Sequence, residues 1–220
     1  MTAFKCPAGR CHGVVVVRSE AELRSGGSRQ LRKAAATACQ LILIIGSPAF
    51  GHTGSTSADF AGAFNHPLFG PDHIVAMIGV GLWGAFLGQP AIFVLPSVFP
   101  IIMACGGMIG ILGLHVPAVE TGIALSAVAI GMMVAMAARP PLAPAAALVG
   151  MFAIFHGYAH GAELPPGANA LSYFLGFVVA TGMLHLAGIS FGLLARWPLG
   201  RIAVRAAGGA IAVAGVVFLL

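Results

Sequence analysis

The sequence predicts an all-α integral membrane protein, a bundle of about six transmembrane helices that follows a cleavable signal peptide. Of its 220 residues, 59% are hydrophobic and only 8% are charged, too few polar side chains to cover a soluble globule. The apolar residues come in runs of about 20, the number that a helix needs to cross a bilayer about 30 Å thick. Because these runs lack the two-residue alternation of a membrane β-barrel, helices are expected.

The basic charge of the chain belongs to its N-terminal part. Seven basic and two acidic residues precede position 52, whereas the rest of the chain carries four of each. The net charge of +5 therefore does not describe the hydrophobic part, and we infer no nucleic-acid partner from it.

Residues 29–51 have the organisation of a signal peptide. A basic stretch ending at Lys33 precedes a short apolar run, and Ala49-Phe50-Gly51 provides the small residues that signal peptidase recognises. Cleavage is expected just before His52. An uncleaved first transmembrane helix is the alternative, although the apolar run is short for a span.

This assignment divides the chain into three parts. Residues 1–28 are a polar N-terminal extension or reflect a mis-assigned start, residues 29–51 are the signal peptide, and residues 52–220 form the transmembrane domain. The lipid bilayer is thus the first expected partner of the chain. Homo-oligomerisation stays open at this point.

Turn-forming residues divide the apolar sequence into six predicted spans. The breaks are Gly88-Gln89-Pro90, His115-Val116-Pro117, Arg139-Pro140-Pro141, Leu164-Pro165-Pro166-Gly167 and Trp197-Pro198. The helices between them are expected at about residues 66–87, 91–113, 118–138, 142–161, 169–194 and 199–219.

The few charges predict how the chain crosses the membrane. If cleavage leaves the new N-terminus outside, the segments near residue 139 and residues 196–205 face the cytoplasm. All four arginines of the transmembrane domain then lie inside, and most histidines and carboxylates lie near the outer face. We therefore expect a multi-pass protein of the bacterial cytoplasmic (inner) membrane with the mature N-terminus outside.

A first polar segment lies at the start of the first predicted span. His66 and His73 are seven residues apart, close to two helical turns, so they share nearly one helix face. Asp72 either binds a metal itself or orients the neighbouring imidazole. Gly70-Pro71 weakens the helical hydrogen bonds between the two histidines and predicts a polar notch within the membrane. Because ionisable groups inside a membrane are costly, they usually serve a function.

A second polar segment lies near the end of the fourth predicted span. His156, His160 and Glu163 stand at i, i+4 and i+7 and form one stripe on a helix. Imidazole and carboxylate ligands at this spacing suit nickel, cobalt or zinc better than copper(I). An interhelical hydrogen-bonded pair is the alternative for either segment alone. Two such segments near the outer face favour a metal.

Three further residues are candidate stations for an ion that crosses the membrane. His185 lies well inside the fifth predicted span, where a packed, hydrogen-bonded histidine is an equal alternative. Glu120 opens the third predicted span, where an acidic residue also stabilises a helix N-terminus. His52 becomes the N-terminus after cleavage, and its amine and imidazole could chelate a metal together.

These polar segments also carry a resemblance to a known family. The stretch His66-Pro67-Leu68-Phe69-Gly70-Pro71-Asp72-His73 continues through Ala76-Met77 and Val80-Gly81-Leu82-Trp83. It resembles the H-P-x-x-G-x-D-H signature of the HupE/UreJ family of nickel/cobalt permeases, with that family's A-M and V-G-x-W continuation. Further support comes from the segments around the later histidines, Phe155–Pro165 and Thr181–Ile189.

The resemblance implies a secondary permease that takes up Ni²⁺ or Co²⁺, with an indirect link to hydrogenase or urease maturation. The metal ion is then a transported substrate rather than a cofactor, and the protein is not an enzyme. Two sets of residues match the family's metal-binding motifs, namely His66, Asp72 and His73, and His156, His160 and Glu163. Nothing in the sequence resembles a nucleotide-binding P-loop, so coupling to ATP hydrolysis is not expected.

Two other functions remain as alternatives. One is an intramembrane zinc metallohydrolase, with zinc on His73, His156 and His160 and with Asp72 or Glu163 as the general base. The sequence has no H-E-x-x-H motif, and a catalytic centre needs one tight cluster, whereas a pathway tolerates a series of sites. The other alternative is a non-transporting metal-binding assembly or sensory subunit.

Overall fold

The computed structural model describes residues 60–220, and every regular element within them is helical. The predicted extension 1–28, the predicted signal peptide 29–51 and His52 lie outside these residues. The helices in chain order are α2 (Phe60–Phe69), α3 (Pro71–Leu87), α4 (Ala91–Ile111), α5 (Val119–Ala135), α6 (Leu142–Ala162), α7 (Ala170–Gly192), the 3₁₀ turn η1 (Leu193–Arg196) and α8 (Pro198–Phe218).

Several of these helices are long and apolar enough to cross a membrane. Four qualify alone, namely α4, α6, α7 with η1, and α8, and the bent pair α2 and α3 makes a fifth if it is counted as one span. Helix α5 is apolar but has only 17 residues. The prediction of a multi-pass α-helical membrane protein is therefore confirmed, and the count of six spans stays a prediction.

The predicted breaks between helices fall where the proline-containing segments are. Helix α3 ends just before Gly88-Gln89-Pro90, and α5 ends shortly before Arg139-Pro140-Pro141. The chain turns at Trp197, after which Pro198 occupies the first position of α8. Proline suits this first position because its missing amide has no helical acceptor there anyway.

One expectation is wrong: residues 66–87 are not one continuous helix. Helix α2 (Phe60–Phe69) contains Pro67 in its interior and meets α3 at a bend of 80° around Gly70. Pro71 starts α3 and has no amide to donate to the Pro67 carbonyl, so the helical ladder fails at this point. The predicted polar notch thus becomes a change of chain direction.

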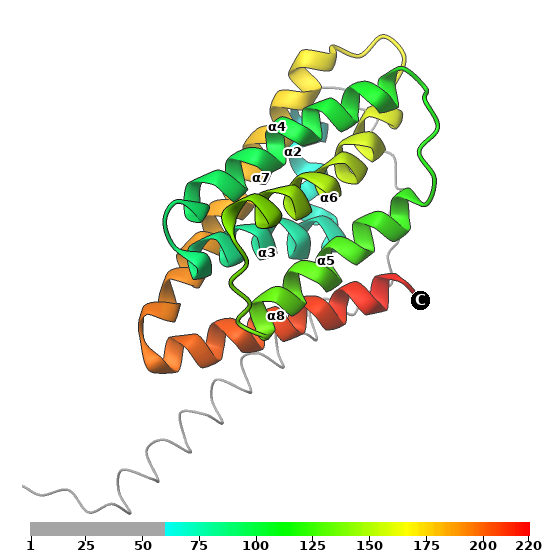
Figure 1. The fold of residues 1–220 in the computed structure, drawn as a ribbon. Helices are drawn as coiled ribbons and strands as arrows, with labels where there is room; N and C mark the ends of the chain where they lie inside the picture. Colours follow the sequence, from blue (N-terminus) through cyan, green and yellow to red (C-terminus); the bar gives the residue numbers. More distant parts are fainter. Residues whose placement is uncertain (1–59) are drawn as a thin grey trace, which may run out of the picture. The chain divides into compact units, whose positions relative to one another are not determined.

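The helices pack in pairs that are mostly not consecutive in sequence. Helix α4 lies against α6, α5 against α8, and both α2 and α3 against α7 (Figure 1). Most residues of α3 are buried, because α3 also contacts α4, α5 and α8. Large apolar side chains such as Phe93, Leu186 and Val217 are exposed on the outside. Such a surface suits lipid rather than water.

Glycines allow α4 and α6 to approach closely. A Cβ at Gly157 would overlap the Met103 carbonyl, and one at Gly161 would overlap the Gly107 carbonyl. Small residues at such contacts let two helices pack closely in lipid. Each of these two α6 glycines directly follows a histidine. One face of α6 therefore meets α4, while His156 and His160 are buried on a neighbouring face.

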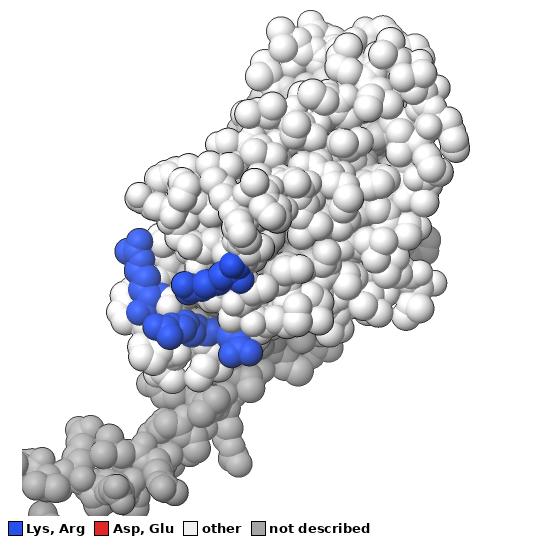
Figure 2. Space-filling model, in the orientation of Figure 1, with Lys and Arg blue, Asp and Glu red and all other residues white. Residues whose placement is uncertain are grey.

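The four arginines of the described residues lie together at one end of the helices. Arg205 Nε donates to the carbonyl of Ala135 at the end of α5 (2.8 Å), and the Arg139 guanidinium lies 5.1 Å from the ring centre of Phe86. Figure 2 shows the arginine side chains gathered on one part of the surface. The turns 88–90 and 193–197 belong to this end as well.

Candidate metal centre

His73 is buried in the first turn of α3 and is held by its neighbour. Its Nδ1 lies 2.9 Å from Oδ1 of Asp72, and its side chain is only 6% exposed. A carboxylate can only accept a hydrogen bond, so Nδ1–H of a neutral His73 donates and Nε2 carries the lone pair. Nε2 has no hydrogen-bond partner among the described residues. This pairing of carboxylate and imidazole is common behind metal-binding histidines.

His160 occupies the last turn of α6 and is 1% exposed. Its ring stacks on Phe177 of α7, with 3.8 Å between ring centres, which fixes its orientation. Neither ring nitrogen has a hydrogen-bond partner in residues 60–220. Two ring nitrogens without hydrogen-bond partners are costly in a membrane interior, so His160 is well placed to bind a metal ion.

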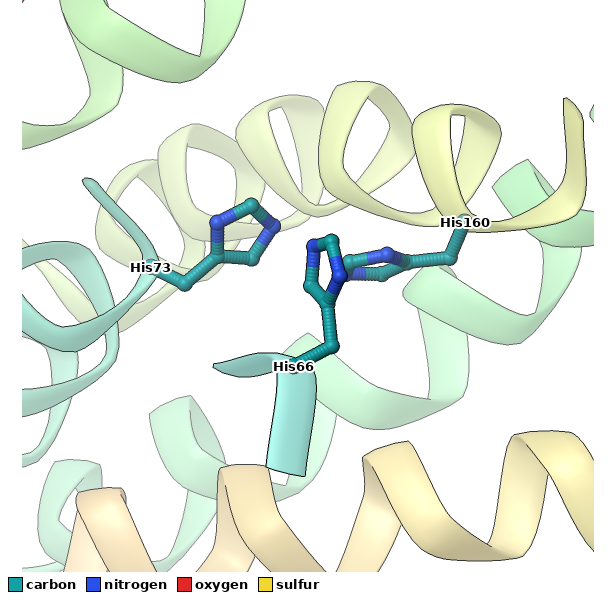
Figure 3. Close-up of side chains that lie close together, drawn as sticks. All are labelled: His66, His73 and His160. Carbon is teal, nitrogen blue, oxygen red and sulfur yellow. The ribbon is translucent and has the colours of Figure 1, made fainter. Parts of the chain in front are cut away.

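His66 comes from α2 and completes a group of three histidines, which we call the histidine triad: His66, His73 and His160 (Figure 3). The His66 ring centre lies 5.3 Å from that of His73 and 5.2 Å from that of His160. One ligand atom from each residue lies within 4.8 Å of the others. Unlike the other two residues of the triad, His66 is exposed.

The distances between the ligand nitrogens of the triad are close to those found around a bound metal ion. Two nitrogens that bind one ion at about 2.1 Å are at most about 4.2 Å apart. Closing the 4.8 Å group to this limit needs a movement of less than about 1 Å, and the spacing of about 3.4 Å in a tetrahedral site needs about 1.4 Å.

The bend between α2 and α3 creates this geometry. In a continuous helix, residues seven positions apart are separated by about 10 Å along the axis. The bend brings the rings of His66 and His73 to 5.3 Å and turns both toward His160. The two polar segments therefore face one another, and the first segment reaches this arrangement by the bend between α2 and α3.

His156 lies beside the triad and has a fixed tautomer. Ser126 of α5 donates its hydroxyl hydrogen to the Ile123 carbonyl (2.6 Å), so its Oγ must accept from His156 Nε2 (3.1 Å). The lone pair of His156 is then on Nδ1, which is buried and has no partner among the described residues. The His156 and His73 rings lie 5.2 Å apart.

A profile of the family described as "HupE / UreJ protein" matches residues 40–218. The chain belongs to the HupE/UreJ family. This family is associated with nickel and cobalt uptake and is of the transporter type. The resemblance drawn from the sequence motifs is therefore confirmed.

A curated relative of this HupE/UreJ chain is "Protein HupE" from Rhizobium leguminosarum bv. viciae. The two are 43% identical over 178 residues, which cover 81% of this chain and 93% of the relative. No solved structure matches the chain.

The remaining candidate residues of the HupE/UreJ protein lie apart from the triad. Glu163 is exposed immediately after α6, and Glu120 is exposed in the first turn of α5. Neither belongs to the group of ligand atoms within 4.8 Å, and their roles as ligands stay predictions. His185 is 2% exposed in α7. The site thus consists of imidazoles, with Asp72 as its nearby carboxylate.

Sequence reasoning missed two residues that shape this site. Ser126 fixes the tautomer of His156, and Phe177 orients His160. Ser126 is a hydroxyl residue within an apolar helix, which could have drawn attention to it. Phe177 carries no such feature, because it is one of many phenylalanines in the predicted spans.

Proposed function

We propose that this HupE/UreJ protein is a secondary permease that takes up divalent nickel, or cobalt, across the bacterial cytoplasmic membrane. The observation that carries the proposal is the histidine triad, in which ligand atoms from α2, α3 and α6 lie within 4.8 Å of one another. Membership of a family associated with nickel and cobalt uptake supports the same conclusion. Broken helices are also found at the substrate sites of other secondary transporters.

In this proposal the ion exchanges its water shell for imidazole nitrogens. His66 is the exposed residue of the triad and makes the first contact, after which Nε2 of His73 and a ring nitrogen of His160 bind the ion. His156 Nδ1 offers a further ligand about one helical turn before His160 on α6. Asp72 orients His73 and places a negative charge near the cation.

The arrangement of charges supports entry from the outer face. Arg139 precedes α6, whereas His160 is in the last turn of that 21-residue helix, so the arginine end and the triad are separated along it. The positive-inside rule assigns the arginine end to the cytoplasm. The triad then belongs to the outer half of the membrane.

Uptake of radioactive nickel by cells expressing His73→Ala tests the proposal. We expect uptake to fall at least about tenfold at equal protein abundance, because the substitution removes a ligand that Asp72 orients. His115→Ala is the matched control, since His115 is an exposed histidine outside the triad. Unchanged uptake by His73→Ala would contradict the assignment of the triad.

The compactness of the triad also suits a resident zinc, such as a metallohydrolase would hold. A hydrolase needs a carboxylate that is free to act as a general base. Asp72 is engaged by His73, and Glu163 is exposed outside the triad. This arrangement favours transport over hydrolysis.

Nickel flux measured with purified protein in sealed vesicles distinguishes a permease from a non-transporting subunit. A permease moves external nickel into the lumen, and the flux disappears in His73→Ala. Metal binding without flux would instead indicate a non-transporting subunit.

A further inference from the structure

A second polar pair lies deeper in the helices than the triad. Thr181 and His185 of α7 are 1% and 2% exposed, and they are four residues apart on one helix face. Oγ1 of Thr181 and Nε2 of His185 are both buried, and neither has a hydrogen-bond partner among the described residues. Buried polar atoms in a membrane usually find partners, so a pair without them points to a ligand.

The two prolines inside α4 explain how the His185 ring is held. Pro100 has no amide, so the carbonyl of Pro96, four residues earlier, lacks its helical donor. The backbone of Pro96 lies close enough to the His185 ring to interact with it, and its carbonyl can only accept a hydrogen bond. Because His185 Nε2 is unpaired, Nδ1–H must be the donor, and the lone pair of His185 lies on Nε2.

His185 therefore has the same arrangement as His73 and His156. In each of the three residues, one ring nitrogen donates to a fixed oxygen and the other keeps an unpartnered lone pair. A backbone carbonyl behind an imidazole is a common way to orient a metal-binding histidine. Thr181 adds a neutral oxygen one helical turn away.

The position of the pair follows from α7 itself. Phe177, which stacks on His160 of the triad, is four residues before Thr181 and eight before His185. Along the helix axis, Thr181 therefore lies about 6 Å beyond Phe177, and His185 lies about 12 Å beyond it. Helix α7 continues from there to η1 and Arg196, at the arginine end.

Phe99 of α4 contacts both His156, beside the triad, and His185 of the deeper pair. Its ring is fully buried, with its centre 5.4 Å from the ring of His156 and 5.5 Å from the ring of His185. Both contacts are edge-to-face, so one aromatic ring contacts both histidines.

We propose that Thr181 and His185 form a second binding site for the same divalent cation, on the arginine side of Phe99. The proposal rests on the permease function above and adds the step that follows capture. The ion binds His185 Nε2 and Thr181 Oγ1 after the Phe99 ring moves aside. Two neutral side chains bind more weakly than the triad, and weak binding allows release from a transport path.

The test uses full-length protein in sealed vesicles, with nickel as the probe. His185→Asn retains a donor near the position of Nδ1 for the Pro96 carbonyl but removes Nε2. Thr181→Val removes only the hydroxyl, and Thr181→Ser retains it. We expect both His185→Asn and Thr181→Val to lower nickel flux at least about tenfold, while Thr181→Ser keeps most of it.

Nickel binding by the purified variants provides the second readout. The tight binding event at the triad is expected to be unchanged in His185→Asn, whereas a weaker second event is lost. Ser190→Ala, in the exposed part of α7, is the matched control and is expected to resemble the unmodified protein in both measurements.

The outcomes separate this proposal from the permease function. If His73→Ala abolishes flux but His185→Asn and Thr181→Val transport normally, the second site is wrong and the permease function stands. If His73→Ala also transports normally, the triad assignment fails first. Should His185→Asn not fold, the comparison of Thr181→Val with Thr181→Ser decides, and equal flux of those two variants would overturn the proposal.

Discussion

The triad and the arginine end use polar side chains in opposite ways. His73 and His160 are buried between helices and keep unpartnered ring nitrogens, whereas the four arginines lie at one end of the helices and two of them bond to backbone carbonyls. Inward-facing polar groups are costly in a membrane unless they bind something, while outward-facing cations at helix ends cost little. We infer that the triad carries function and that the arginines fix orientation.

The largest expected effect comes from the helix contact that supports the triad. Gly161→Ala places a Cβ against the Gly107 carbonyl, so α4 and α6 must separate next to His160. We expect a loss of about 1–3 kcal/mol in the free energy of unfolding together with weaker nickel binding. Thermal unfolding in detergent and metal titration measure the two effects.

Gly182→Ala in α7 is the control for this change, because nothing lies within 4 Å of its Cβ position. An alanine there is expected to stabilise the helix by about 0.5–1 kcal/mol. Equal stability of the two alanine variants would contradict the close packing of α4 on α6.

The second largest effect is expected for His160→Ala. It removes a ligand from the triad and leaves the α4 contact intact, because the adjacent Gly161 provides that contact. Nickel affinity of the purified protein should fall at least about tenfold, and loss of the ring stacked on Phe177 should lower the unfolding temperature as well. If Arg201→Ala, at the other end, lowers affinity as much, the division of roles between the two regions is wrong.

Asp72→Asn tests the support behind the triad. The asparagine side chain is close in size to aspartate, but it lacks the charge and offers a weaker acceptor to Nδ1 of His73. Loss of such a partner typically weakens metal binding by about 10–100-fold. Unchanged affinity would mean that Asp72 does not orient His73, and Asp59→Asn provides a comparison outside the described residues.

Acidification should also weaken capture. Imidazoles bind a metal only in their neutral form, so added protons compete with nickel for the same lone pairs. Nickel affinity should therefore fall as pH falls and be restored when pH is raised again. A titration in which affinity rises on acidification would contradict histidine as the main ligand. The four arginines stay protonated throughout such a titration, so the charge of the arginine end does not change.

Most of the site residues could be predicted from sequence, because their chemistry is rare in an apolar chain. His66, His73, His156 and His160 stand out against their neighbours, and Gly70-Pro71 marks the place where the helix fails. The 80° bend could not be predicted, since a glycine and a proline permit a bend without setting its angle. Helix spacing alone therefore places His66 and His73 on one helix face, whereas in the structure a bend brings their rings together.

The supporting residues depend on contacts between helices that are distant in sequence. Ser126 supports His156 only because α5 packs beside α6, and Phe99 meets His185 only because α4 also contacts α7. The Pro96 and Pro100 pair was a readable indication that one carbonyl in α4 lacks a helical donor. That His185 of α7 lies beside this carbonyl could be learned only from the fold.

The smallest expected effect is at the arginine end. Arg205→Ala removes the bond from Nε to the Ala135 carbonyl, which links α8 to the end of α5. Because this side chain is exposed, the loss should lower the free energy of unfolding by only about 1 kcal/mol or less. Arg201→Ala should cost less still, since its bond to the Ala195 carbonyl is longer, at 3.3 Å, and spans only six residues. Thermal unfolding of both variants measures this order, and nickel affinity should be unchanged in each. A marked drop in affinity for Arg205→Ala would show that the arginine end is coupled to the triad through α5, where Ser126 holds His156, and the two regions would then act as one.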